Sequence, residues 1–315
     1  MVQILTAATL WGTAGTFAKY LFNSRIPAYD LAQIRLTLSF VILLLVLACF
    51  NRKLLRVQPR DLRYLAVFGI AGLGMVQFTY LFTISLTNVA TAVFLQYLAP
   101  ALVLLFGLFT RTERLSFLKF LALLAAVIGG YLIVRGTAAG FGLHPLGLAS
   151  GLASAAAFAF YTIYGKHGLA SHNSWTILAW GMAFGSAAWF LYQPPWALVP
   201  RYSAETWLAF AIFASVATVL PFGLYFQGLT RLTAFRTGLT STIEPVVAAV
   251  TAFSFLGERL ALLQVLGCTL VLLGVILIQL SAQVAPDQPL DPVKGQPHQP
   301  RTGMHDHPRS DFAKE

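Results

Sequence analysis

The chain has 315 residues, of which 57% are hydrophobic and only 10% are charged. Soluble domains carry about 25% charged residues, so this composition excludes a water-soluble globular protein. The net charge of +10 is compatible with nucleic-acid binding, but the basic residues lie between apolar blocks rather than along one face, and we expect no nucleic-acid partner.

The apolar residues fall into blocks of about 20, the length at which a helix crosses roughly 30 Å of hydrocarbon. Helix is the structure that satisfies its own backbone hydrogen bonds in lipid, so the blocks predict an all-α, multi-pass integral membrane protein with ten transmembrane helices. The predicted spans are residues 2–22, 31–50, 62–84, 88–109, 115–134, 146–166, 174–192, 204–228, 235–256 and 259–280.

The loops that share a side with the N-terminus carry most of the basic residues, including the cluster from Arg52 to Arg63 and the pair Arg111 and Arg114. Basic loops stay in the cytoplasm, so we expect both termini on the cytoplasmic side of a bacterial inner membrane. Residues 281–315 are rich in Pro, Gln, Asp and His, a composition that predicts a disordered cytoplasmic tail.

An internal repeat is the most informative feature of the sequence. Pro100, Glu113 and Gly129 have the same spacing as Pro245, Glu258 and Gly274. Each of the two glutamates is the first residue of a Glu-Arg-Leu tripeptide. The repeats cover residues 2–134 and 146–280, with five predicted helices each. Because five is odd, the second copy must cross the membrane in the opposite direction, an arrangement typical of secondary transporters with a binding site near the midplane.

The repeated pattern of Pro, apolar run, Glu-Arg-Leu and Gly resembles the EamA domain of the drug/metabolite transporter superfamily. The segments Leu10-Trp11-Gly12-Thr13, Tyr97-Leu98-Ala99-Pro100 and Glu244-Pro245-Val246 support the resemblance. It implies ten helices, cytoplasmic termini and transport of small metabolites, often amino-acid export. One departure is that Ala99 stands opposite Glu244.

Glu244 is predicted near the centre of the ninth span, where a carboxylate costs at least about 2.5 kcal/mol. Thr237, Ser241 and Glu244 share one helix face, which we orient towards a central cavity. Glu244 and Ser241 are therefore predicted to contact substrate, and Glu244 is a candidate carrier of a coupling proton. The alternative is a protonated glutamate hydrogen-bonded to a neighbouring helix.

Two prolines and two further glutamates occupy equivalent places in the repeats. Pro100 and Pro245 lie mid-span and leave the carbonyls of Gln96 and Ser241 without a helical partner, so we predict kinks that either line the cavity or only bend the chain. Glu113 and Glu258 lie at turns, where they are expected to cap the next helix or to pair with an arginine.

Aromatic and amide side chains recur inside the spans, and such residues suit a cavity for an amphipathic organic solute. The alternative is ordinary packing and hydrogen bonding between helices. The substrate-binding candidates of this kind are Trp11, Gln77, Tyr80, Gln96, Tyr97, Tyr161, Tyr164 and Trp180. Lys19 and Arg35 are expected to extend towards the interface, with attraction of an anionic solute as the other possibility.

The repeat, the mid-span prolines and the single midplane acid favour a secondary transporter, with export of small metabolites such as amino acids by alternating access. The rival classes are a membrane-embedded enzyme and a non-transporting membrane subunit. The sequence has no recognisable metal, catalytic or nucleotide-binding motif, so we expect no enzyme activity, cofactor or metal. The expected partners are a small-molecule substrate and the lipid bilayer, and the pattern specifies no oligomeric state.

Overall fold

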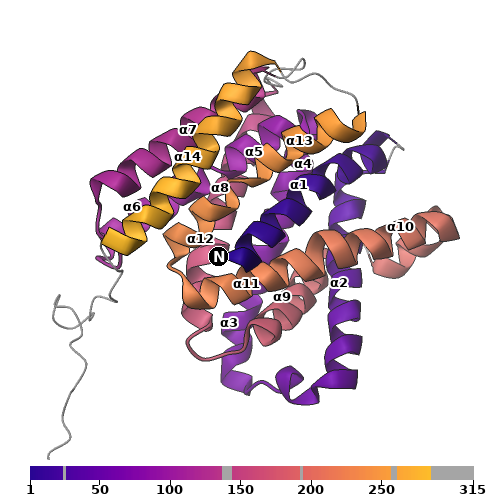
Figure 1. The fold of residues 1–315 in the computed structure, drawn as a ribbon. Helices are drawn as coiled ribbons and strands as arrows, with labels where there is room; N and C mark the ends of the chain where they lie inside the picture. The colour runs from indigo at the N-terminus through magenta and orange to yellow at the C-terminus, as the bar shows by residue number, and fades with distance from the viewer. Residues whose placement is uncertain (24–25, 137–143, 192–193, 257–260, 285–315) are drawn as a thin grey trace, which may run out of the picture.

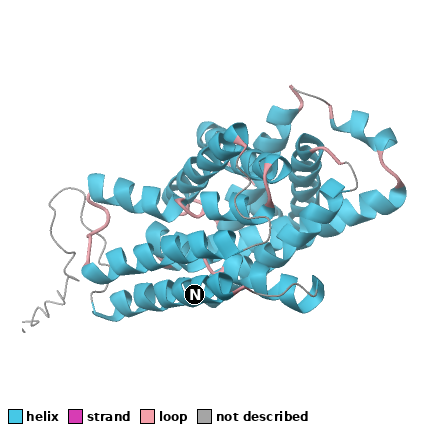
Figure 2. Ribbon diagram, turned by 90° about the horizontal axis from the view of Figure 1, so that it is seen from above, coloured by secondary structure: helices cyan, strands magenta, loops and turns pink. Residues whose placement is uncertain are grey.

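The computed structural model describes residues 1–23, 26–136, 144–191, 194–256 and 261–284, and within these ranges the secondary structure is helical (Figures 1 and 2). Seven helical stretches of the described chain are long and apolar enough to cross a membrane: Ala28–Phe50, Pro59–Leu86, Val89–Phe109, Phe117–Gly136, Pro145–Gly168, Ala204–Arg231 and Leu262–Ser281. The other predicted spans are also helical but are not among these seven, so the assignment of ten spans stays a prediction.

The first half of the chain, residues 2–134 of the predicted repeat, begins with two uninterrupted helices and ends with another. Its elements are α1 (Val2–Asn23), α2 (Ala28–Phe50), the short helices η1 (Arg52–Leu55) and η2 (Pro59–Asp61), α3 (Leu62–Val67), the π-helix η3 (Phe68–Gly74), α4 (Met75–Leu86), α5 (Val89–Gln96), α6 (Ala99–Phe109) and α7 (Phe117–Gly136).

The second half, residues 146–280 of the predicted repeat, follows the same plan. Its elements are α8 (Pro145–Gly168), α9 (Ser174–Trp189), η4 (Pro195–Arg201), α10 (Ala204–Ala214), the π-helix η5 (Ser215–Val219), α11 (Leu220–Arg231), α12 (Ala234–Ser241), α13 (Glu244–Leu256) and α14 (Leu262–Val284). Because α14 continues to Val284, the helix extends past the predicted start of the tail, and residues 285–315 lie outside the described residues.

Several helices start where a polar side chain accepts a hydrogen bond from the first turn. Asn88 caps α5, Asn173 caps α9, Ser203 caps α10 and Thr233 caps α12. A side-chain cap satisfies a backbone N–H that has no partner within the helix, typically for about 1 kcal/mol. These caps fix the points where the chain re-enters the bundle.

The two halves are interrupted at corresponding places. Helix α5 ends before Tyr97 and Leu98, with Pro100 in the first turn of α6, and α12 ends before Thr242 and Ile243, just ahead of Pro245. Each proline therefore starts a second helix segment instead of bending a continuous helix. The π-helices η3 and η5 likewise interrupt the third and eighth predicted spans.

Helices α7 and α14 lie side by side at one edge of the bundle (Figure 1). A Cβ added to Gly129 would meet the carbonyl oxygen of Gly267 at 2.7 Å, and one added to Gly274 would meet the carbonyl oxygen of Ala122 at 2.8 Å. Residues with higher numbers in α7 contact residues with lower numbers in α14, so the two helices are antiparallel. The absence of side chains at the glycines lets the backbones approach closely.

The bundle has two ends, which we name from α1. The near end, where α1 begins, contains a bond from Gln3 Nε2 to Gln227 Oε1 at 3.0 Å and one from Lys166 Nζ to the Leu229 carbonyl at 2.6 Å. At the far end, where α1 ends and α2 begins, Tyr202 donates to the Asp30 carboxylate at 2.6 Å.

Candidate functional site

A cavity lies inside the far half of the bundle, between helices of both halves of the chain. Its empty volume is about 500 Å³, including the part open to solvent. The lining residues are Trp11, Ala14, Arg35, Val76, Gln77, Tyr80, Gln96, Tyr97, Phe158, Phe213, Phe222 and Glu244. Among the described residues, the lining therefore combines an apolar wall rich in rings with one cation, one acid and a few uncharged polar groups, as small-molecule sites usually do.

Glu244 is the acid of this cavity, and the break between α12 and α13 places it there. It is the first residue of α13 and is only 4% exposed. Its carboxylate oxygen Oε2 accepts a hydrogen bond of 2.7 Å from the Tyr97 hydroxyl, and Tyr97 follows directly after α5 at the corresponding break. The two interrupted helices thus meet at the cavity, and this bond is one of those that join the first half of the chain to the second.

Arg35 is the cation of the cavity, and here the sequence prediction is wrong. Its side chain is 5% exposed instead of extending to the interface. Nε donates to the Thr218 hydroxyl at 2.5 Å, and Nη2 donates to the Ala217 carbonyl at 2.6 Å. Both acceptors belong to the π-helix η5, where the irregular backbone offers its groups to a neighbouring helix. The side chain of Lys19 lies outside the described part of the chain.

The surroundings of Arg35 hold it in place without neutralising it. Its guanidinium carbon lies 4.9 Å from the centre of the Phe213 ring, a cation–π geometry. Among the described residues no carboxylate lies within 4.0 Å of Arg35, and Glu244 attracts it electrostatically without contact. The cavity therefore contains two opposite buried charges that do not form an ion pair.

The predicted amide residues also line the cavity, in different bonding states. Gln96 Nε2 donates to the Ser154 hydroxyl at 2.9 Å, whereas Gln77, which is 2% exposed, has an amide nitrogen with no hydrogen-bond partner in the described structure. Ser241 is not among the residues that line the cavity, and its hydroxyl donates to the Gly238 carbonyl of its own helix at 2.7 Å. Trp11, Tyr80 and Tyr97 do line it.

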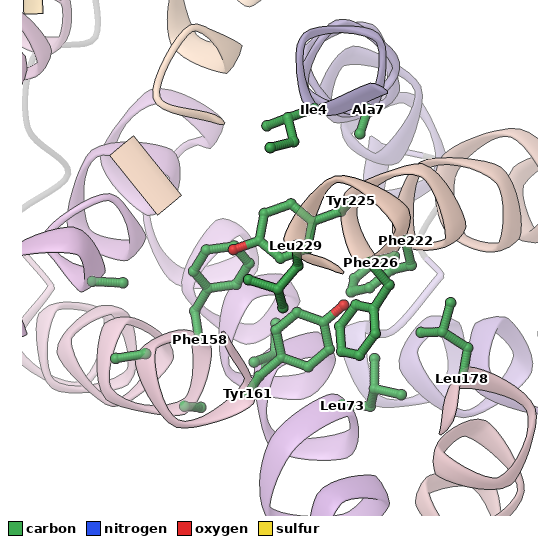
Figure 3. Close-up of a cluster of buried hydrophobic side chains, with 14 of the residues drawn as sticks. Ile4, Ala7, Leu73, Phe158, Tyr161, Leu178, Phe222, Tyr225, Phe226 and Leu229 are labelled. Carbon is green, nitrogen blue, oxygen red and sulfur yellow. The ribbon is translucent and has the colours of Figure 1, made fainter. Parts of the chain in front are cut away.

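A cluster of buried rings, several of which are drawn in Figure 3, adjoins the cavity and shares Phe158 and Phe222 with its wall. We define this aromatic cluster as Phe68, Phe158, Tyr161, Phe222, Tyr225 and Phe226. Tyr161 was predicted to bind substrate, but it lies one layer below the cavity wall, between Phe158 and Phe226. The Tyr225 hydroxyl is 2.9 Å from the Thr162 hydroxyl, whereas the Tyr161 hydroxyl has no partner in the described structure.

Two other predicted substrate residues lie away from the cavity, towards the near end. Tyr164 stacks on Tyr64 with ring centres 4.6 Å apart, and its carbonyl accepts a hydrogen bond from the Tyr64 hydroxyl. Trp180 donates from its indole nitrogen to the Leu55 carbonyl at 3.2 Å. Both residues thus pack helices together, which was the alternative interpretation of their position in the sequence.

Of the two glutamates predicted to be structural, Glu113 is described by the structure and Glu258 is not. The Glu113 carboxylate accepts a hydrogen bond of 2.5 Å from Lys119 Nζ, and both side chains are almost fully buried. Its partner is therefore a lysine in the first turn of α7, whereas the prediction was a cap on the next helix or a pair with an arginine. Glu258 lies outside the described residues. In the described ranges no group of three His, Cys, Asp or Glu side chains is placed to hold a metal ion.

Known proteins resemble this chain over most of its length. The sequence model of the EamA-like transporter family matches residues 1–135 and 145–280. The uncharacterized inner membrane transporter YicL of Salmonella typhimurium is 31% identical over 90% of this chain and 96% of its own length. The threonine/homoserine exporter RhtA of Escherichia coli is 29% identical over 84% of this chain and 86% of its own.

A solved structure supports the same fold. One crystal structure superimposes with a TM-score of 0.73, covering 90% of this chain and 97% of the other at 23% identity. At that identity the likeness concerns the fold alone. Membrane transporters are thus the named proteins that this sequence resembles, which strengthens one of the function classes weighed from the sequence.

Proposed function

Because this chain belongs to the EamA-like transporter family, we propose that it is a secondary transporter that exports small metabolites, amino acids among them, by alternating access. The family name and the transporter relatives support the general activity, and the name of RhtA supports amino-acid export. The rival interpretations, an enzyme or a non-transporting subunit, gain no support from these relatives.

We place the protein in the bacterial inner membrane with both termini and the near end in the cytoplasm. The distribution of basic residues supports this orientation. We further propose ten spans in two inverted repeats. Three matching features support the inversion: the antiparallel pairing of α7 with α14 through equivalent glycines, the two helix breaks, and the two π-helices.

The observation that carries the proposal is the bond between Tyr97 and Glu244 within the cavity. It joins the two halves of the chain at 2.7 Å, next to both helix breaks. A solute group that binds the Glu244 carboxylate shares that carboxylate with the Tyr97 hydroxyl, so the solute and the first half of the chain meet at one side chain. Solute binding is therefore coupled to the contact between the halves, as alternating access requires.

The state of the cavity suggests the direction of movement between the two sides. The cavity lies in the far half, and the aromatic cluster fills the space between it and the near end. This arrangement corresponds to a conformation closed towards the cytoplasm. Export then requires a second conformation in which the rings of the cluster separate and solute reaches the cavity from the near end.

We include a proton as the coupling ion in this proposal. Glu244 is the one carboxylate among the residues that line the described cavity. A proton and a cationic solute group cannot occupy this carboxylate together, so the two would cross the membrane in opposite directions. Within this chain no nucleotide-binding motif offers another source of energy.

The test is counterflow in sealed proteoliposomes that contain the purified full chain. Wild-type protein preloaded with an unlabelled amino-acid mixture should accumulate labelled amino acids transiently, and Glu244→Gln should lose at least about 10-fold in initial rate. Glu205→Gln is the matched control, because Glu205 is exposed on α10. Equal counterflow by Glu244→Gln and wild type would remove Glu244 from the mechanism, and no counterflow by wild type with any amino acid would refute amino-acid transport.

A further inference from the structure

We propose that the cavity binds an α-amino acid in its zwitterionic form with an apolar side chain, so that Arg35 holds the carboxylate and Glu244 the ammonium group. This assignment rests on the proposed transport function, because it specifies the substrate class of the same cavity. It is argued from the two unpaired charges and the rings that surround them.

Arg35 lacks the partner that a buried guanidinium normally has. Burying a charge is costly unless an opposite charge and hydrogen bonds compensate it, and Arg35 has hydrogen bonds but no acid in contact. Its Nε and Nη2 are occupied by η5, which leaves Nη1 for the cavity that the residue lines. A guanidinium fixed in this way is already oriented for a carboxylate.

Glu244 is prepared for a cation in the same way. Its Oε2 accepts the Tyr97 hydroxyl, and the described structure shows no hydrogen bond to its Oε1. An ammonium group has three N–H donors and matches an acceptor-only carboxylate. In an α-amino acid the ammonium and carboxylate groups are attached to one carbon atom, so a single small molecule can bridge two opposite charges that face one cavity without touching.

Gln77 adds a second donor for the ligand. Its amide nitrogen is buried, lines the cavity and has no hydrogen-bond partner in the described structure. A buried donor without a partner costs free energy until something accepts its hydrogen. The second oxygen of a carboxylate bound at Arg35 is the acceptor that we assign to it.

The remaining walls determine which side chain fits. Trp11 forms the floor of the cavity together with Phe158 and Phe222 of the aromatic cluster, whose ring centres lie 6.4 and 5.0 Å from that of Trp11. Rings offer no acceptor for a hydroxyl group, whereas they favour apolar surface. We therefore expect leucine and phenylalanine to bind about 10-fold more tightly than threonine, although RhtA is named for threonine and homoserine.

The experiment measures binding to the purified full chain in detergent by titration calorimetry with three ligands. The ligands are L-phenylalanine, phenethylamine, which lacks the carboxylate, and 3-phenylpropionate, which lacks the ammonium group. Wild-type protein should bind phenylalanine at least about 10-fold more tightly than either analogue. Leucine and threonine complete the series and test the apolar floor.

Variants then assign each charge. In Arg35→Gln the preference for phenylalanine over phenethylamine should fall to within about 3-fold, while the preference over 3-phenylpropionate stays. In Glu244→Gln the preference for phenylalanine over 3-phenylpropionate should fall to within about 3-fold, while the preference over phenethylamine stays. Arg60→Gln is the control, since the Arg60 side chain is 79% exposed. If Arg35→Gln does not fold, Thr218→Val, which removes the acceptor of Nε, should weaken phenylalanine binding and leave phenethylamine binding unchanged.

The possible outcomes separate this inference from the transport function. Equal binding of phenylalanine and phenethylamine to wild-type protein would overturn the inference, as would an equal loss for all three ligands in Arg35→Gln. No binding of the series would overturn it as well. If the predicted binding pattern is found but proteoliposomes show no counterflow, transport is refuted and the ligand assignment stands. If counterflow occurs but does not require the ligand carboxylate, transport stands and the ligand assignment is refuted.

Discussion

The cavity and the aromatic cluster are neighbouring regions with opposite composition. The cavity contains Arg35, Glu244 and an amide nitrogen that has no hydrogen-bond partner in the described structure, and burying such groups is costly. The cluster fills its space with its own rings, and one of its two phenol groups is bonded to Thr162. The comparison indicates that the cavity is arranged for a polar guest, whereas the cluster fills its volume with its own side chains and leaves one hydroxyl, that of Tyr161, without a partner in the described structure.

The difference extends to what each region contributes. Packed rings stabilise a protein through buried contact, so the cluster should set the stability of the conformation closed at the near end. Unpaired charges lower stability and are retained for binding. We therefore expect substitutions in the cluster to change stability more than solute recognition, and substitutions in the cavity to do the reverse.

The largest expected effect is the loss of a ring from the cluster. Phe226→Ala removes a fully buried side chain that packs on Phe68 and Tyr161, and a change of this kind costs about 3–5 kcal/mol of unfolding free energy. Denaturant titration in detergent measures it. Phe253→Ala is the control, because Phe253 is 52% exposed, and an equal loss in both variants would show that the cluster has no special contribution.

The next largest effect is expected in the cavity. Tyr97→Phe removes the donor to Glu244 and leaves a buried carboxylate with one partner fewer, for a cost of about 1–3 kcal/mol. We expect the counterflow rate to fall about 10-fold. For the same loss of unfolding free energy, a variant of the cluster should slow counterflow less. Tyr131→Phe, on the exposed face of α7, is the control. Unchanged counterflow would mean that the bond between the halves is only structural.

A smaller effect of opposite sign is expected from Tyr161. Its hydroxyl is buried without a partner, so Tyr161→Phe should raise the unfolding free energy by about 1–2 kcal/mol. A cluster stabilised in this way opens less readily, and counterflow should slow even though no cavity residue has changed. Lower stability of this variant would show that the hydroxyl is satisfied and that the cluster contains no unfavourable group.

These comparisons also show which features the sequence could supply. Length and apolarity located the helices, because crossing lipid sets a narrow range of helix lengths. The repeat pointed to the family, which the matched family model confirms. Trp11, Gln77 and Tyr97 were predicted to bind substrate because they are aromatic or amide side chains inside apolar spans, and all three line the cavity.

Arg35 shows where such reasoning fails. A cation near the end of a predicted span normally extends to the interface, and nothing in the sequence reveals that the π-helix η5 provides two acceptors for it. Tyr164 and Trp180 show the complementary error. A polar face on a helix can be recognised from spacing, but the neighbour that it meets depends on packing that the sequence does not display.

The smallest effect is expected at the far end, beyond the cavity. Tyr202 donates to Asp30 at 2.6 Å, and Arg201 also approaches Asp30, at 3.5 Å, so Tyr202→Phe leaves the carboxylate a partner. We expect the unfolding free energy to fall by about 0.5–1 kcal/mol. Counterflow should stay normal, since the contact belongs to neither the cavity nor the cluster.

The pH dependence of that loss separates a hydrogen bond from a general packing defect. Burial and the bond to Asp30 raise the pKa of Tyr202 above its ordinary value of 10.0, so the phenol keeps its proton in the folded state. A group whose pKa is raised by folding contributes stability that is complete below the unfolded pKa and is lost only as the pH rises above it. The difference between wild type and Tyr202→Phe should therefore stay constant from about pH 6 to about pH 9 and shrink at higher pH. A difference that already disappears near neutral pH would mean that another titrating group, and not the phenol, supports this contact.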